Sequence, residues 1–137
     1  MWKPLLGILA GVFASFVAVM LGDGLGHALY PPPAGFDFNN PEMRADFISK
    51  SPLSANLALL FGQFLAGFVC AWVCNRVARG SKYQPAPIAI VGLLIAALLN
   101  LKMVGGHPVW FWVANVAVII VGGWLGIRLS KQAGVPA

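Results

Sequence analysis

The sequence predicts an all-α membrane protein, with four transmembrane helices in an up-down bundle and a short interfacial helix in the first outer loop. Charge is scarce: 9% of the 137 residues are charged and 59% are hydrophobic, whereas soluble domains carry about 25% charged residues. The apolar residues form four continuous runs instead of alternating with polar ones, which favours helices over a barrel. A chain in lipid must satisfy its backbone hydrogen bonds internally, and helices do so within each run. We therefore expect a single transmembrane domain over residues 1–137.

The four apolar runs give four expected spans of the length that a membrane requires, which is roughly 20 residues. The expected spans are residues 5–28, 53–75, 86–104 and 109–128. The third run is the weakest, because its uncharged part covers only Ile88–Leu101. It reaches a full span only if Lys102 extends its ammonium group to the interface. We expect the first run to be retained, since its apolar core is longer than the roughly 7–15 residues of a signal peptide.

Basic residues predict the orientation of the chain in the membrane. With the N-terminus in the cytoplasm, the inner side holds six basic residues and no acid: Lys3, Arg76, Arg79, Lys82, Arg128 and Lys131. The outer side then holds three basic and four acidic residues: Arg44, Lys50, Lys102, Asp23, Asp37, Glu42 and Asp46. This asymmetry follows the positive-inside rule and predicts that both termini are cytoplasmic. The basic residues lie at helix ends rather than on a solvated face, so the sequence predicts no nucleic-acid partner.

The outer loop over residues 30–52 is expected to contain the short helix. Asn40 can cap it, Pro41 suits its first position, and Glu42 lies near the positive end of the helix dipole. Asp46 and Lys50 are spaced to pair one turn apart. We expect about nine residues of helix on the outer membrane surface, acting as a connector, a lid or a partner-binding surface.

The stretch GDGLGHALYPPPAG places an acid and an imidazole where the first span leaves the membrane. Asp23 and His27 are four residues apart, so both lie on one face of the helix. His107 lies in the other outer loop and could approach the same corner. The three side chains could bind zinc or a similar ion. The other interpretation is an exposed acid–imidazole pair at a helix end.

Polar and small residues inside the spans leave further alternatives open. Gln63, Asn100 and Asn115 could line a pore, or they could form hydrogen bonds between helices. Small residues recur at four-residue spacing, which predicts close helix contacts either within one chain or between chains. These pairs are Gly7 with Gly11, Gly22 with Gly26, Gly62 with Ala66, Gly67 with Ala71, and Gly122 with Gly126.

The first half of the chain resembles a group of small four-helix bacterial inner-membrane proteins of unassigned function that carry a YPPPAG segment. The likeness rests on that segment and on the acidic loop and glycine-rich second span that follow it, within HALYPPPAGFDFNNPEMRADFISKSP and LFGQFLAGFVCAWVCNRVARG. The resemblance implies a multi-pass protein of the bacterial inner membrane. It implies no chemistry.

The sequence contains no nucleophile–base pair, phosphate loop or nucleotide motif, and it therefore predicts neither an enzyme nor a cofactor. The leading interpretation is a non-enzymatic membrane protein that self-associates or serves as an accessory subunit of a larger membrane complex. The lipid bilayer is then its first partner. A small channel or transporter with a polar lining and an outward-facing metal-binding protein are the alternatives.

Overall fold

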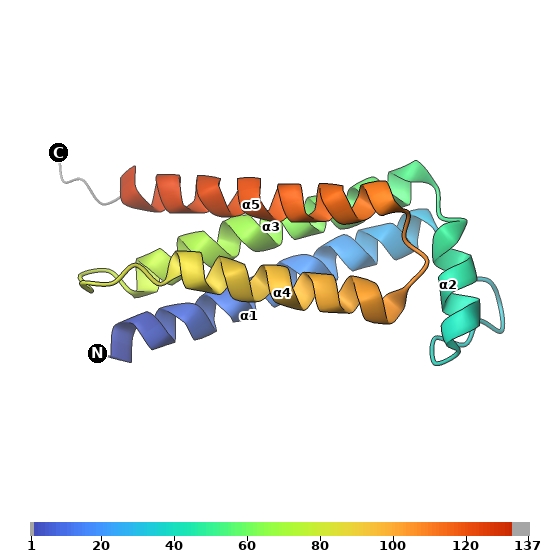
Figure 1. Cartoon of the computed structure of the whole chain (residues 1–137), viewed down its shortest axis with the longest axis horizontal. Helices are drawn as coiled ribbons and strands as arrows, with labels where there is room; N and C mark the ends of the chain where they lie inside the picture. Colours follow the sequence, from blue (N-terminus) through green and yellow to red (C-terminus); the bar gives the residue numbers. More distant parts are fainter. Residues whose placement is uncertain (1, 133–137) are drawn as a thin grey trace.

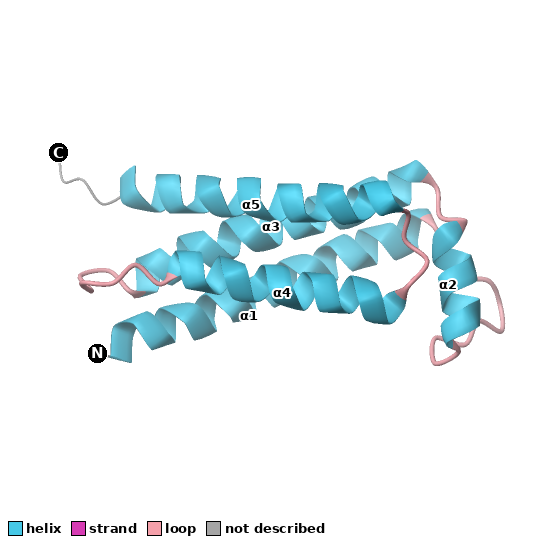
Figure 2. Ribbon diagram, viewed as in Figure 1, coloured by secondary structure: helices cyan, strands magenta, loops and turns pink. Residues whose placement is uncertain are grey.

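The computed structural model describes residues 2–132 and contains helices but no strands within that range (Figures 1 and 2). The helices are α1 (Trp2–Leu29), α2 (Pro41–Ser49), α3 (Leu53–Val77), α4 (Ala86–Val104) and α5 (Val109–Gln132). All except α2 are long and apolar enough to cross a membrane. The prediction of an all-helical chain with four such helices is confirmed. The helix bounds are close to the expected spans, with α1 and α5 extending further at the ends predicted to be cytoplasmic.

The four long helices lie side by side, and consecutive ones run in opposite directions (Figure 1). The start of α1 and the end of α5 are at one end of the molecule, which we call the inner end. The short helix α2 crosses the other, outer end, near the turn that joins α4 to α5. That turn contains Gly105 and Gly106, with φ angles of 71° and 79°. Because side chains rarely tolerate such angles, glycine suits both positions.

Helix α3 is the centre of the structure, and glycines bring its neighbours close to it. A Cβ atom added to Gly22 of α1 would lie 2.6 Å from the Cα atom of Gly62 in α3. Gly67 of α3 meets the backbone of Ile119 in α5, and Gly122 of α5 meets the backbone of Phe64 in α3. In lipid, such close backbone contact supplies much of the attraction between helices. These small residues therefore act within this chain.

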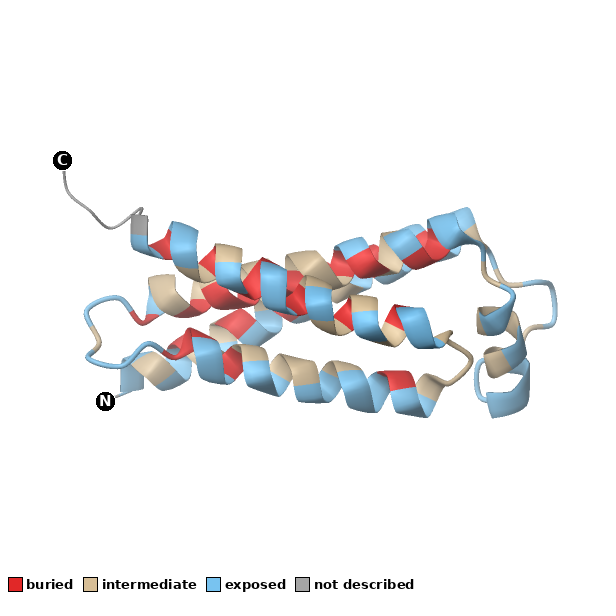
Figure 3. Ribbon diagram, turned by 45° about the horizontal axis from the view of Figure 1, so that its top comes forward, coloured by how far each residue is buried: buried red, intermediate tan, exposed pale blue. Residues whose placement is uncertain are grey.

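Large apolar side chains lie mostly on the outside, and small ones fill the interior (Figure 3). Ala66, Cys70, Ala71 and Cys74 are completely buried. Phe13, by contrast, is 72% exposed. A soluble protein rarely exposes so much continuous apolar surface, whereas lipid solvates it at no cost. This distribution agrees with the membrane class that the composition predicts.

Two tryptophan–arginine pairs lie near the inner end of the bundle. The guanidinium carbon of Arg76 is 4.9 Å from the ring centroid of Trp72, and that of Arg128 is 5.2 Å from Trp124. Both pairs have the same spacing along their helices. Such cation–π contacts fix the position of a charged group beside an aromatic ring.

The short helix α2 begins at the predicted residue. The Asn40 Oδ1 atom accepts hydrogen bonds from the backbone N–H groups of Glu42, at 3.0 Å, and Met43, at 3.2 Å. The Lys50 Nζ atom lies 2.7 Å from the Asp46 carboxylate. The cap and the ion pair are thus confirmed. The position of α2 on a membrane surface stays a prediction.

Candidate functional site: an outer pocket

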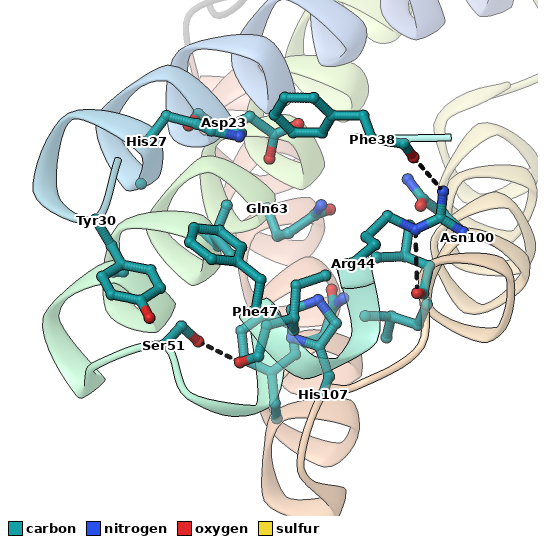
Figure 4. A pocket seen from close by; sticks show the side chains of 18 of the residues that line it. Asp23, His27, Tyr30, Phe38, Arg44, Phe47, Ser51, Gln63, Asn100 and His107 are labelled. Atoms are coloured by element: carbon teal, nitrogen blue, oxygen red, sulfur yellow. Dashed lines mark hydrogen bonds between the residues drawn. The ribbon is translucent and has the colours of Figure 1, made fainter. Parts of the chain in front are cut away.

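A pocket of about 240 Å³ lies at the outer end of the molecule, and residues from all five helices line it (Figure 4). We call it the outer pocket. Its polar and charged lining residues are Asp23, His27, Tyr30, Arg44, Ser51, Gln63, Asn100, His107 and Asn115. Gly26, Ala55 and Ala97 also line it. Because these three residues have small side chains or none, they leave space that larger residues would fill.

Four of the aromatic rings that line the outer pocket come from α2 and from the loop that follows α1, and Phe111 of α5 also lines the pocket. We call the first four the aromatic cover: Tyr30, Phe36, Phe38 and Phe47. The rings of Tyr30 and Phe47 are stacked with centroids 4.6 Å apart, and Phe36 lies 4.7 Å from Phe38 and 4.9 Å from Phe47. The run Pro31–Pro33 cannot continue α1, so the chain leaves the helix and passes across the outer end. The YPPPAG segment therefore ends α1 and begins the loop that carries Phe36 and Phe38.

Arg44 attaches α2 to the end of α4. Its Nε donates to the Val104 carbonyl oxygen at 3.3 Å, and its Nη2 donates to the Met103 carbonyl oxygen at 3.0 Å. Its Nη1 donates to the Phe38 carbonyl oxygen at 3.0 Å. The last carbonyl groups of a helix lack partners within the helix and carry partial negative charge, so a guanidinium group satisfies them well. The sequence gives no indication of this role for Arg44, because nothing in a linear sequence pairs α2 with the end of α4.

Three side chains of the outer pocket have buried polar atoms with no hydrogen-bond partner among residues 2–132. These atoms are Gln63 Oε1, His107 Nδ1 and Asn115 Oδ1. Asn115 is only 2% exposed. An unsatisfied buried polar group costs about 1–3 kcal/mol. Three such groups around one pocket form a set of unsatisfied hydrogen-bonding positions.

His107 occupies the α4–α5 turn, where burial changes its protonation. Its ring is stacked on Phe111, with centroids 4.3 Å apart and an angle of 10° between the planes. Burial lowers the pKa of His107 below its ordinary value of 6.5, because a charged imidazolium loses its hydration. The ring is therefore neutral at pH 7.

The three predicted metal ligands, Asp23, His27 and His107, all line the outer pocket. The His27 ring, however, is hydrogen-bonded through Nδ1 to the main-chain oxygen of Asp23, at 2.8 Å, so that nitrogen is not free to bind a metal. In the described part of the chain, no group of three histidine, cysteine, aspartate or glutamate residues could hold a metal ion. The geometry therefore gives the metal hypothesis no support. The i,i+4 spacing thus joins His27 to Asp23 by a hydrogen bond to the backbone, and the imidazole also interacts electrostatically with the Asp23 carboxylate.

Gln63, Asn100 and Asn115, the predicted polar lining, also belong to the outer pocket. They come from α3, α4 and α5. The residues predicted to bind a metal and those predicted to line a pore therefore surround the same pocket. Further toward the inner end, the interior is occupied by fully buried residues, including Ala66, Cys70 and Ile119. The polar residues therefore surround a pocket at one end, and a pore lined by them stays a prediction.

Comparisons with protein-family models, curated proteins and solved structures gave no match for this chain. The resemblance to the YPPPAG-containing membrane proteins therefore stays a prediction.

Proposed function

We propose that this chain is a multi-pass protein of the bacterial inner membrane that binds a small ligand in the outer pocket and performs no enzymatic reaction. With both termini in the cytoplasm, the pocket would receive its ligand from the outer side. One observation supports the proposal most strongly: Gln63, His107 and Asn115 carry buried, unpartnered polar atoms around a pocket of about 240 Å³. Sites for small molecules typically combine apolar walls with a few convergent polar groups.

Two other functions that the sequence left open have less support. A channel needs a continuous polar path, and the inner part of the interior is filled by small apolar residues such as Ala66 and Ala71. Self-association through small residues needs free glycine faces. Gly22, Gly67 and Gly122 are used within the chain, which leaves sites such as Gly24 and Gly92, where a Cβ atom would have no neighbour within 4 Å, for contact with a second copy. An accessory role in a larger complex is compatible with ligand binding.

The experiment compares the wild-type protein with Gln63→Leu after purification in lipid nanodiscs. Native mass spectrometry would report a small molecule bound to the wild-type protein and absent from the variant. Gln84→Leu is the matched control, because Gln84 is exposed and lies outside the pocket. Equal occupancy in all three proteins, or no bound molecule in any of them, would contradict the proposed function.

A further inference from the structure

The charges around the outer pocket decide what kind of ligand it suits. Two of the lining residues carry opposite charges, Asp23 and Arg44. Three N–H groups of Arg44 donate to main-chain carbonyl oxygens at the end of α4 and at Phe38, so most of its hydrogen-bonding capacity is already used, although its charge is kept. Within residues 2–132 the Asp23 carboxylate accepts no such set of hydrogen bonds, and His27 is the group that interacts with it electrostatically. Asp23 is therefore the charged lining group whose hydrogen-bonding capacity is left for a ligand.

The unpartnered polar atoms of the outer pocket also favour a ligand that donates hydrogen bonds. Gln63 Oε1 and Asn115 Oδ1 are hydrogen-bond acceptors, and each needs a donor. Neutral His107 carries a proton on one ring nitrogen only, so Nδ1 can also accept a hydrogen bond. An anionic ligand would place hydrogen-bond acceptors against these acceptor atoms and would be repelled by the Asp23 carboxylate. A ligand rich in N–H donors would satisfy them.

The walls and the volume of the outer pocket favour a small organic ligand over a bare metal ion. The aromatic cover presents four rings, which form an apolar wall for the organic part of a ligand. A bare metal ion would need several oxygen or nitrogen ligands close together. Between residues 2 and 132, no three histidine, cysteine, aspartate or glutamate side chains are placed to hold one. The volume of about 240 Å³ is below the roughly 300–1,000 Å³ of sites for drug-sized molecules. The space suits a small organic molecule.

We infer that the ligand of the outer pocket is a small protonated amine with a short apolar body. Asp23 is its counter-ion, the amide oxygens of Gln63 and Asn115 accept hydrogen bonds from its ammonium group, and the aromatic cover contacts its apolar part (Figure 4). This inference depends on the proposed function, because it specifies the ligand of the same pocket.

The test uses three probes that share one body and differ in charge: phenethylammonium, phenethyl alcohol and phenylacetate. Calorimetric titration into the protein in phosphatidylcholine nanodiscs, with empty nanodiscs as the blank, gives the three affinities. We expect phenethylammonium to bind at least about tenfold more tightly than the other two probes. Asp23→Asn should weaken its binding by about tenfold or more, while Asp37→Asn, an exposed acid outside the pocket, should not.

The outcomes separate the ligand class from the existence of the site. If phenylacetate or phenethyl alcohol binds as well as the ammonium probe, and Gln63→Leu weakens that binding, the pocket is a ligand site and the amine inference is overturned. If Asp23→Asn binds phenethylammonium like the wild type, the inference is also overturned. Failure of all three probes overturns it as well, and the native mass spectra then decide whether the pocket holds any ligand. Thermal melting of Asp23→Asn checks that the variant is folded.

Discussion

The inner and outer parts of this molecule are built from the same four long helices, yet their interiors differ. Near the inner end, Ala86 and Ala89 of α4 pack against Cys70, Ala71 and Cys74 of α3, and these residues are almost completely buried. At the outer end, the same helices surround the outer pocket with its unsatisfied polar atoms. The difference comes from side-chain size and from the polar and charged groups that line the outer pocket. Two helices pack closely where small residues on one helix face small residues on the other. A pocket forms where small residues are not faced by side chains that fill the space beside them.

The largest effect should follow from enlarging a glycine at a packed contact. A Cβ atom on Gly67 would overlap with the backbone of Ile119, so Gly67→Leu must separate α3 from α5. We expect it to lower the free energy of unfolding by about 3 kcal/mol, measured by thermal and denaturant melting in detergent. Gly92→Leu is the matched control, because its Cβ would have no neighbour within 4 Å. Equal losses for the two variants would contradict the intramolecular glycine contacts.

A smaller loss should follow from removing the Arg44 side chain. Arg44→Ala leaves the carbonyl groups of Met103 and Val104 without their donors and detaches α2 from α4. We expect a loss of about 2 kcal/mol and faster hydrogen exchange in α2, with the inner end unchanged. Lys50→Ala removes another cation from the same region, but its pair with Asp46 is exposed, so it should change little. Unaltered exchange in α2 of Arg44→Ala would show that Arg44 does not anchor this helix.

The two buried asparagines, Asn115 and Asn56, should respond in opposite directions to the same substitution. Asn115 Oδ1 has no hydrogen-bond partner among residues 2–132, so Asn115→Leu should stabilise the ligand-free protein by about 1 kcal/mol while it impairs ligand binding. The Asn56 side chain has hydrogen-bond partners, including the Ser51 hydroxyl at 3.3 Å and the Pro52 carbonyl oxygen at 3.4 Å. Asn56→Leu should therefore destabilise the protein by about 1 kcal/mol. A loss of stability in Asn115→Leu as large as that in Asn56→Leu would contradict the assignment of unsatisfied polar groups.

The smallest effect is a pH dependence due to His107. Its folded pKa is below 6.5, so the unfolded chain binds a proton first as the pH falls. Stability from this group is complete above about pH 6.5 and decreases as the pH falls toward the folded pKa. His107→Gln should make the melting temperature less dependent on pH in this window. Asp23, His27, Tyr30 and Arg44 share the pocket with His107, so the difference between variant and wild type, rather than the absolute slope, reports on His107. An unchanged slope would show that His107 is not buried in its neutral form.

The sequence predicts the helices well, because each depends on local residues. Continuous apolar runs give the four long helices, and Asn40 with Pro41 gives the start of α2. The sequence also identifies six polar residues of the pocket, but only as two unrelated sets. It cannot bring them together, because the register of α3 on α5 is decided by contacts such as Gly67 with Ile119, which are far apart in the chain.

The missed parts of the site are those that depend on long-range contacts. Arg44 reads as an ordinary outer-loop cation, although the structure joins it to carbonyl groups about sixty residues away. His27 reads as a partner for the Asp23 carboxylate, but it bonds to the backbone of its own helix. The aromatic residues Phe36, Phe38 and Phe47 carry no signal beyond their composition. Their clustering depends on how the loop after Pro33 returns to the bundle.

The most direct test asks from which side of the membrane Gln63 can be reached. In cells that express Gln63→Cys, a small membrane-impermeant thiol reagent added from outside should label the protein, and phenethylammonium should protect it. The wild-type protein should stay unlabelled, because Cys70 and Cys74 are completely buried. Labelling of Gln63→Cys only from the cytoplasmic side, or no labelling from either side, would contradict an outward-facing pocket closed toward the inner end.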